Sequence, residues 1–233
     1  MKKSFTIIIF ALIILTQLSL ASYANTNQII VVKVEDAITP ATKEFIQEVY
    51  DYSLNIKAQA IIVLLNTPGG QLDATIKIIE IMERSEIPWI VYVYPEGSKA
   101  WSAGAFILMA SHIAVMAPHT IVGSAQPVSY SPFEGSTPIE DEKIINALSA
   151  FIAEEAKMHN RNATAAELFV RKNLNLNAEE ALKFKVIDAI APDVNGLLKF
   201  LNGKTVKTIK GLTILETENI TLIEFSPSIK VLF

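Results

Sequence analysis

The sequence predicts an α/β fold in which crossover helices cover a parallel sheet and a small β extension follows at the C-terminus. Short apolar runs of strand length alternate with longer segments whose apolar residues recur every three or four positions. This alternation of strand and helix favours parallel strands joined by right-handed crossovers. With 233 residues, 51% of them apolar, the chain is long enough to bury the core that such a fold needs.

The first 24 residues have the composition of an export signal. Lys2 and Lys3 precede an apolar run that begins at Phe5, and the small residues Ser22 and Ala24 occupy the −3 and −1 positions of a cleavage site. The alternative is an uncleaved anchor, although the apolar stretch is shorter than the roughly 20 residues of a spanning helix. In both cases we expect the rest of the chain to be exported.

The first half of the remaining chain supplies most of the predicted sheet. Apolar, β-branched runs suit buried strands at residues 28–34, 60–65 and 89–94, with shorter pieces at 113–116 and 120–122. Helices are expected after Thr39-Pro40, after Gly70, and from Ser102 to about Ala110.

A long polar segment, residues 123–141, is rich in Ser, Pro and Gly and is expected to be a loop that serves as a lid or binding segment. Helices resume near Glu142, and capping residues are expected at Thr164 and Asn177. Three short β segments then predict a small meander at residues 206–209, 212–215 and 220–225.

Charge and composition exclude several classes of function. The net charge of −4 and the absence of a Lys/Arg block argue against a nucleic-acid partner. The chain has no cysteine, so disulfides and thiolate chemistry are excluded. Its three histidines lack the spacing of a zinc protease motif, and we expect neither a metal nor a cofactor.

Ser102 is the candidate nucleophile. It stands at the predicted start of a helix, where free N–H groups favour negative charge, and small residues follow it. Ser98 is a weaker candidate because it lacks the Ala-Gly that follows Ser102. Gly69 and Gly70 lack side chains, so their backbone can approach a substrate closely. The alternative is that Ser102 only caps a helix and the two glycines only form a turn.

An ordered set of short motifs spans residues 28 to 225. Its members are Asn66-Thr67-Pro68-Gly69-Gly70, Tyr92-Val93-Tyr94-Pro95, Ser102-Ala103-Gly104, Met116-Ala117-Pro118, Ile121-Val122-Gly123-Ser124-Ala125 and Glu179-Glu180-Ala181-Leu182. Together they resemble NfeD-type membrane-associated serine proteases, which share a superfamily with the Clp protease subunit and the crotonases. The resemblance implies a Clp protease/crotonase-like fold. The ordered set is specific, whereas Thr-Pro-Gly-Gly alone is weak evidence.

The resemblance also implies roles for individual residues. Lys143, which follows the long loop, matches the lysine that acts as general base in a Ser-Lys dyad. Gly70 and Ala103 would supply the oxyanion hole, with Gly69 beside them. We expect an extended peptide to bind against one short segment, formed by Gly123, Ser124, Ala125 and Gln126.

Other bases remain open. The Clp subunit uses a histidine that follows its serine, a position that His119 matches most closely, and Lys99 and Lys157 are weaker candidates. The amine of Lys143 must be neutral to act, which apolar burial favours and the preceding acidic run, residues 140–142, opposes. The alternative is therefore a solvated lysine paired with that run.

Three segments follow: a signal peptide or anchor at 1–24, a protease domain at 25–203, and a β extension leading toward a membrane region at 204–233. The predicted function is an extracytoplasmic serine endopeptidase, membrane-associated or secreted. The resemblance implies that it is dimeric and cleaves hydrophobic segments of a stomatin-like membrane protein. The alternatives are an inactive scaffold of a membrane complex and a crotonase-type acyl-CoA enzyme, the latter disfavoured by the export signal.

Overall fold

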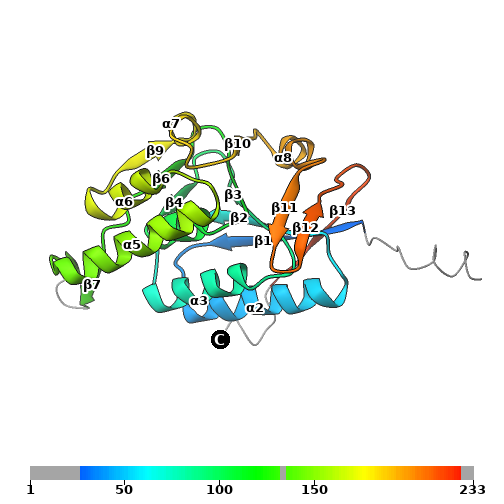
Figure 1. The fold of residues 1–233 in the computed structure, drawn as a ribbon. Helices are drawn as coiled ribbons and strands as arrows, with labels where there is room; N and C mark the ends of the chain where they lie inside the picture. Colours follow the sequence, from blue (N-terminus) through cyan, green and yellow to red (C-terminus); the bar gives the residue numbers. More distant parts are fainter. Residues whose placement is uncertain (1–26, 132–134, 227–233) are drawn as a thin grey trace, which may run out of the picture.

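A six-stranded parallel sheet forms the centre of the computed structural model, which describes residues 27–131 and 135–226 (Figure 1). Its order is β10-β5-β3-β2-β1-β13, and every neighbouring pair is parallel. The strands are β1 (Gln28–Glu35), β2 (Ala60–Asn66), β3 (Trp89–Val93), β5 (Ile113–Met116), β10 (Ala189–Ile190) and β13 (Thr221–Glu224). The predicted parallel α/β architecture is confirmed.

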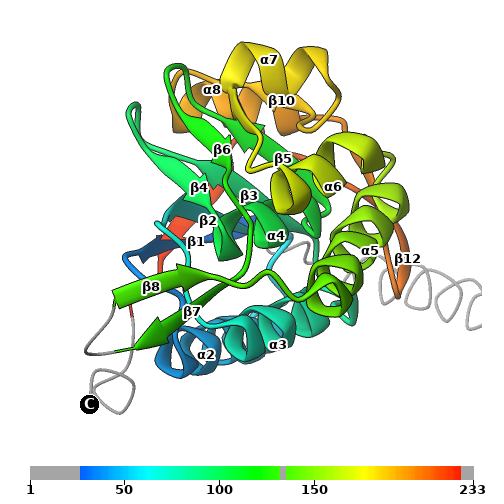
Figure 2. The same ribbon diagram turned by 90° about the vertical axis from the view of Figure 1, so that its left-hand side faces the viewer.

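Each face of this sheet packs against its own apolar core. Side chains alternate along β1, so that Ile30 and Val32 enter one core while Ile29 and Val31 enter the other. The first core is covered by α2 (Pro40–Asn55), α3 (Leu72–Glu83), α4 (Ala103–Met109), α5 (Glu142–Met158), α6 (Ala163–Arg171) and α7 (Ala178–Lys183). The second is covered by α8 (Val194–Leu201) and the hairpin of β11 (Thr205–Thr208) with β12 (Gly211–Ile214) (Figures 1 and 2).

A smaller sheet lies beside the main one and carries the turn that holds Ser102. It consists of β4 (Lys99–Trp101), β6 (Ile121–Gly123) and β9 (Asn175–Asn177). β4 pairs with β6 in parallel, and β6 pairs with β9 in antiparallel orientation. An isolated bridge between Thr67 and Ala100 connects β4 to the end of β2.

Three local expectations differ from the structure. The long loop contains a hairpin, β7 (Val128–Ser131) with β8 (Gly135–Pro138), which we missed because it lacks the apolar alternation of a half-buried strand. Asn162, not Thr164, caps α6, and its side chain accepts from the N–H of Ala165 at 3.0 Å. The third segment of the expected meander is β13, which pairs along the open edge of β1.

The remaining expectations are either confirmed or concern residues that the structure does not describe. Thr39 caps α2 with Pro40 at its first position, and Asn177 caps α7 in a capping box with Glu180. The predicted signal or anchor and residues 227–233 lie outside the described residues. In the ranges that are described, none of the helices has the length and apolarity needed to cross a bilayer.

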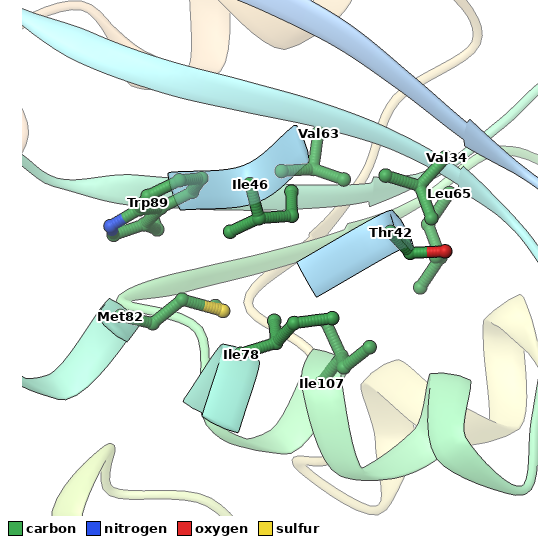
Figure 3. A pocket seen from close by; sticks show the side chains of 9 residues that line it. All are labelled: Val34, Thr42, Ile46, Val63, Leu65, Ile78, Met82, Trp89 and Ile107. Atoms are coloured by element: carbon green, nitrogen blue, oxygen red, sulfur yellow. The ribbon is translucent and has the colours of Figure 1, made fainter. Parts of the chain in front are cut away.

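A small apolar cavity lies where α2, α3 and α4 meet the sheet (Figure 3). It is lined by Val34, Thr42, Ile46, Val63, Leu65, Ile78, Met82, Trp89 and Ile107. Its volume of about 10 Å³ is at or below the minimum needed to hold one water molecule, and its lining offers almost no polar partner. The cavity is a packing defect and not a substrate site.

Glu155 of α5 gives the fold a pH-dependent weakness. Its side chain is 3% exposed, and burial, with the hydrogen bond and negative charge of neighbouring Glu83, raises the pKa of Glu155 to about 8. A carboxyl whose pKa is higher in the folded state binds more protons when folded. Its contribution to stability is therefore complete below pH 4.5 and is lost as pH rises toward 8.

We expect Glu155→Gln to remove this dependence. The contribution of Glu155 to the free energy of unfolding falls by up to about 1.4 kcal/mol per pH unit between pH 5 and 8, which is the expected difference in slope between the unmodified chain and Glu155→Gln. Urea unfolding at pH 5.5, 7 and 8.5 measures the slope, with Glu154→Gln, at an exposed position of the same helix, as the control. Equal slopes in the unmodified chain and Glu155→Gln would contradict the account.

Candidate active site

Ser102 occupies a sharp turn between β4 and α4. Its φ of 51° and ψ of −114° lie outside the common regions for a non-glycine residue, and such strain concentrates at functional sites. Its N–H donates to the carbonyl of Gly123 at 3.0 Å, which fixes the backbone. The side chain makes no capping hydrogen bond to α4. Ser102 therefore occupies the N-cap position without a capping bond from its side chain, and its half-buried hydroxyl has no hydrogen-bond partner within the described residues.

Gly69 lies directly against Ser102. A Cβ at Gly69 would stand 2.6 Å from the Cβ of Ser102, and its φ of 122° is one that only glycine adopts readily. The hydroxyl of Thr67 accepts from the N–H of Gly69 at 3.1 Å and donates to the carbonyl of Asp36 at 2.5 Å. These contacts hold the glycine turn in place beside the serine.

Gly70 directs its N–H away from the neighbouring segment around Ile38. Ile38 forms a parallel bridge with Gly70: its N–H donates to the carbonyl of Gly69, and its carbonyl accepts from the N–H of Gln71, both at 2.8 Å. The N–H of Gly70 therefore points to the opposite side. Ala103, the first residue of α4, likewise has an N–H that no intrahelical bond satisfies. Within the described residues neither N–H has a hydrogen-bond partner.

The far end of α4 is also fixed, so Ser102 stands on a rigid element. Arg161 is buried, and its guanidinium donates to the carbonyls of Met109 and Ser111 at 2.8 and 2.7 Å. It also forms an ion pair with Asp188 at 2.8 Å. Carbonyl groups that would otherwise be unpaired at the end of the helix are thereby satisfied.

The segment from Gly123 to Gln126 passes next to Ser102, but its donors are already in use. The N–H groups of Ser124 and Ala125 donate to the carbonyls of Leu174 and Phe169 at 3.0 and 2.9 Å. The N–H of Gln126 donates to the side chain of Asn173 at 3.1 Å. These three N–H groups, and the carbonyl of Gly123 that accepts from Ser102, are therefore already engaged before a peptide binds.

Our sequence reasoning missed Asn173, which fixes this segment from the other side. Its side-chain amide donates to the carbonyl oxygen of the Gln126 side chain at 2.6 Å while also accepting from the backbone. Its φ of 50° is one that asparagine adopts more readily than most residues. An Asn after a predicted helix was the available signal, but it did not indicate which segment Asn173 would meet.

Lys143 is the second residue of α5, and its side chain is exposed. Its backbone N–H donates to the carboxylate of Asp141 at 2.8 Å, which caps the helix. Within the described residues its amine forms no ion pair with the acidic run and no hydrogen bond with Ser102.

Residues 28–212 match the family model described as NfeD1b, N-terminal domain. The chain belongs to the NfeD1b family.

Known relatives agree with this membership. The membrane-bound protease PH1510 of Pyrococcus horikoshii is 39% identical over 206 residues, which are 88% of this chain and 47% of that protein. The membrane protein NfeD1b of Bacillus subtilis is 28% identical over 204 residues, 82% of this chain and 45% of that one. The chain spans about half the length of these curated relatives.

Solved structures confirm the fold. A lysine-to-alanine mutant of the 1510-N membrane-bound stomatin-specific protease, in complex with a substrate peptide, gives a TM-score of 0.82 at 37% identity over 88% of this chain and 94% of that one. A serine-to-alanine mutant of the same protease gives 0.81 at 37% identity, with coverages of 87% and 99%. The ClpP catalytic domain of Plasmodium falciparum shares the fold at a TM-score of 0.53 and 16% identity, with coverages of 69% and 83%.

The rival residues in this NfeD1b-family chain are engaged elsewhere. Ser98 is 3% exposed, so it is a poor nucleophile candidate. His119 is exposed, with its Nε2 3.8 Å from a carboxylate oxygen of Glu96. The amine of Lys99 lies over the Trp101 ring, and that of Lys157 pairs with Glu154 at 2.6 Å.

Substitution of Gly69 tests whether the glycine turn shapes the site. We expect Gly69→Ala to lower kcat/KM for peptide cleavage by at least about a hundredfold, because the new methyl group displaces Ser102 from its position. Gly97→Ala is the matched control: Gly97 also has a positive φ, of 83°, but its Cβ would meet nothing within 4 Å. Equal activity of the two variants in a peptide assay would contradict this role for Gly69.

Proposed function

We propose that this chain is an exported serine endopeptidase with Ser102 as nucleophile and Lys143 as general base. One observation carries the proposal: the hydroxyl of Ser102, which has no hydrogen-bond partner among the described residues, stands at a strained strand-to-helix turn, between Gly69 and the start of α4. A reactive serine on a sharp turn of this kind is a known way to present a nucleophile at the top of a sheet.

The proposed reaction uses the free groups around Ser102. Its hydroxyl attacks the peptide carbonyl and transfers its proton to the neutral amine of Lys143. The N–H groups of Gly70 and Ala103 stabilise the oxyanion, and the ammonium of Lys143 then protonates the leaving amine. Water hydrolyses the acyl-enzyme with the same lysine as base.

The spacing of the dyad supports the choice of Lys143. The serine and the lysine replaced in the two 1510-N mutants are 41 positions apart, and so are Ser102 and Lys143. Because Lys143 is exposed and its amine has no ion pair in the part of the chain that the structure describes, the amine is available to approach Ser102 when a peptide binds. The proposed dyad therefore forms with substrate bound.

The proposed substrate is a hydrophobic segment of a stomatin-like membrane protein, bound in extended form against residues 123–126. The support is the specificity for stomatin that the name of 1510-N states, together with the position of this segment beside Ser102, whose N–H donates to the carbonyl of Gly123. We also propose that the enzyme works as a homodimer close to a membrane. Val128 at the start of β7 and Ile144 in α5 are exposed, and they offer apolar surface for a second subunit.

A fluorophosphonate probe with mass-spectrometric mapping tests the reactive group. We expect covalent labelling at Ser102 and competition by an apolar peptide, with no competition by a peptide of the same length in which aspartates replace the apolar residues. Absence of labelling and of cleavage would instead favour the inactive scaffold. Binding of acyl-CoA, with no peptide cleavage, would favour the crotonase-type enzyme.

A further inference from the structure

The hairpin of β11 and β12, residues 205–214, has an unusually apolar outer face. It carries the three most exposed large apolar side chains of the described residues: Leu212 at 75%, Ile209 at 64% and Ile214 at 59%. Val206 on the opposite side of the hairpin is buried in the second core, so the alternation of the strands turns Leu212 and Ile214 outward. Clustered exposed apolar side chains of this kind mark an interaction surface.

The same region is rich in lysine, although the chain as a whole is acidic and one of these lysines, Lys210, is paired with Glu86. Residues 194–215 contain four lysines and no Asp or Glu, in a chain of net charge −4. These lysines are Lys199, Lys204, Lys207 and Lys210. Lys207 lies directly opposite Leu212 in the hairpin ladder, so a cation and an apolar side chain are neighbours on the outer face.

The hairpin lies at the end of the sheet where the strands begin. Lys210 pairs with Glu86, just before β3, at 3.2 Å, and the side chain of Asn27, just before β1, donates to the carbonyl of Asn219 at 3.0 Å. Figure 1 shows the hairpin, in orange, at the same end as the start of β1, in blue. The glycine turn beside Ser102 follows the opposite ends of β1 and β2, about 20 Å away for strands of this length.

We propose that the β11–β12 hairpin docks onto the surface of an anionic phospholipid bilayer. Leu212, Ile209 and Ile214 enter the boundary between headgroups and acyl chains, while the lysines remain at the level of the phosphates. Charge complementarity selects this occupant, since each lysine near an anionic membrane surface contributes attraction. A two-fold contact with a second copy would instead bring the same lysines against one another. Docking at this end leaves Ser102 accessible.

The absence of cysteine from the chain allows a local test. Leu212→Cys in the full chain is labelled with the environment-sensitive fluorophore NBD and mixed with vesicles of phosphatidylcholine, with or without 30% phosphatidylserine. We expect emission to rise and shift to shorter wavelength, with protection from iodide quenching, only with the anionic vesicles. The same label at Leu182→Cys, exposed on α7, should not respond. Because the readout is local, insertion of the N-terminal segment alone leaves the label at position 212 in water.

Removal of lysines tests the charge. In the labelled chain, Lys204→Gln and Lys207→Gln should each lower the apparent vesicle affinity roughly fivefold, whereas Lys172→Gln, at an exposed position after α6, should not change it. A label at position 212 that stays in water with both kinds of vesicle overturns the proposal. A response that needs no vesicles and grows with protein concentration also overturns it, and assigns the hairpin to a contact between copies.

Discussion

Ser102→Ala is expected to lower kcat for cleavage of apolar peptides by at least about a thousandfold, because the neighbouring hydroxyls of Thr67 and Ser124 are engaged in hydrogen bonds and do not replace the nucleophile. The loss should leave the fold intact. The Ser102 side chain makes no capping bond to α4, so its oxygen contributes little to stability. Steady-state kinetics and thermal unfolding of the same preparations measure both quantities.

Ser98→Ala is the matched control for this substitution. Ser98 precedes β4 in the same loop and is buried, so its loss should leave kcat within about twofold of the unmodified chain. If Ser102→Ala retains cleavage, Ser102 is not the nucleophile and the proposed function is contradicted.

Lys143→Ala is expected to lower kcat by about a hundredfold to ten-thousandfold, the contribution of a general base to proton transfer. Lys143→Arg should be equally inactive, because a guanidinium stays protonated at any accessible pH. Neither change should alter the melting temperature appreciably, since the side chain is exposed and forms no ion pair among the described residues. Steady-state kinetics and thermal unfolding of the three proteins measure both quantities.

Lys99→Ala and Lys157→Ala are the controls for the base. Both lysines contact other side chains in the structure, and we expect the two variants to keep kcat within about twofold of the unmodified chain. If Lys143→Ala retains activity while one of these variants loses it, the base lies at that other position.

The fold was predictable because its central strands carry a strong signal. Residues 60–65 and 89–94 are continuous apolar runs, and in the structure β2 and β3 are buried from end to end except at the last residue of β2. The β7–β8 hairpin was not predictable in this way. Its strands are short, and β8 is exposed throughout, so no apolar period distinguishes them from a loop.

The site was only partly predictable. The motif around Ser102 placed a serine at a helix start, and the structure has it there, but the positive φ that frees its hydroxyl from the helix leaves no signal in the sequence. The role of Asn173 also leaves no signal in the sequence, because its contact with Gln126 joins segments that are 47 residues apart. The exposed position of Lys143 depends on how the segment after β6 is ordered, which residue types alone do not determine.

The dyad is tested most directly by a crystal structure of the unmodified chain with a peptide aldehyde bound at Ser102. We predict that the Nζ of Lys143 lies within about 3.2 Å of the Ser102 Oγ, and that the N–H groups of Gly70 and Ala103 donate to the aldehyde-derived oxygen. A structure in which the ligand is bound but this amine stays in solvent, with no other base within reach of Oγ, would contradict the account.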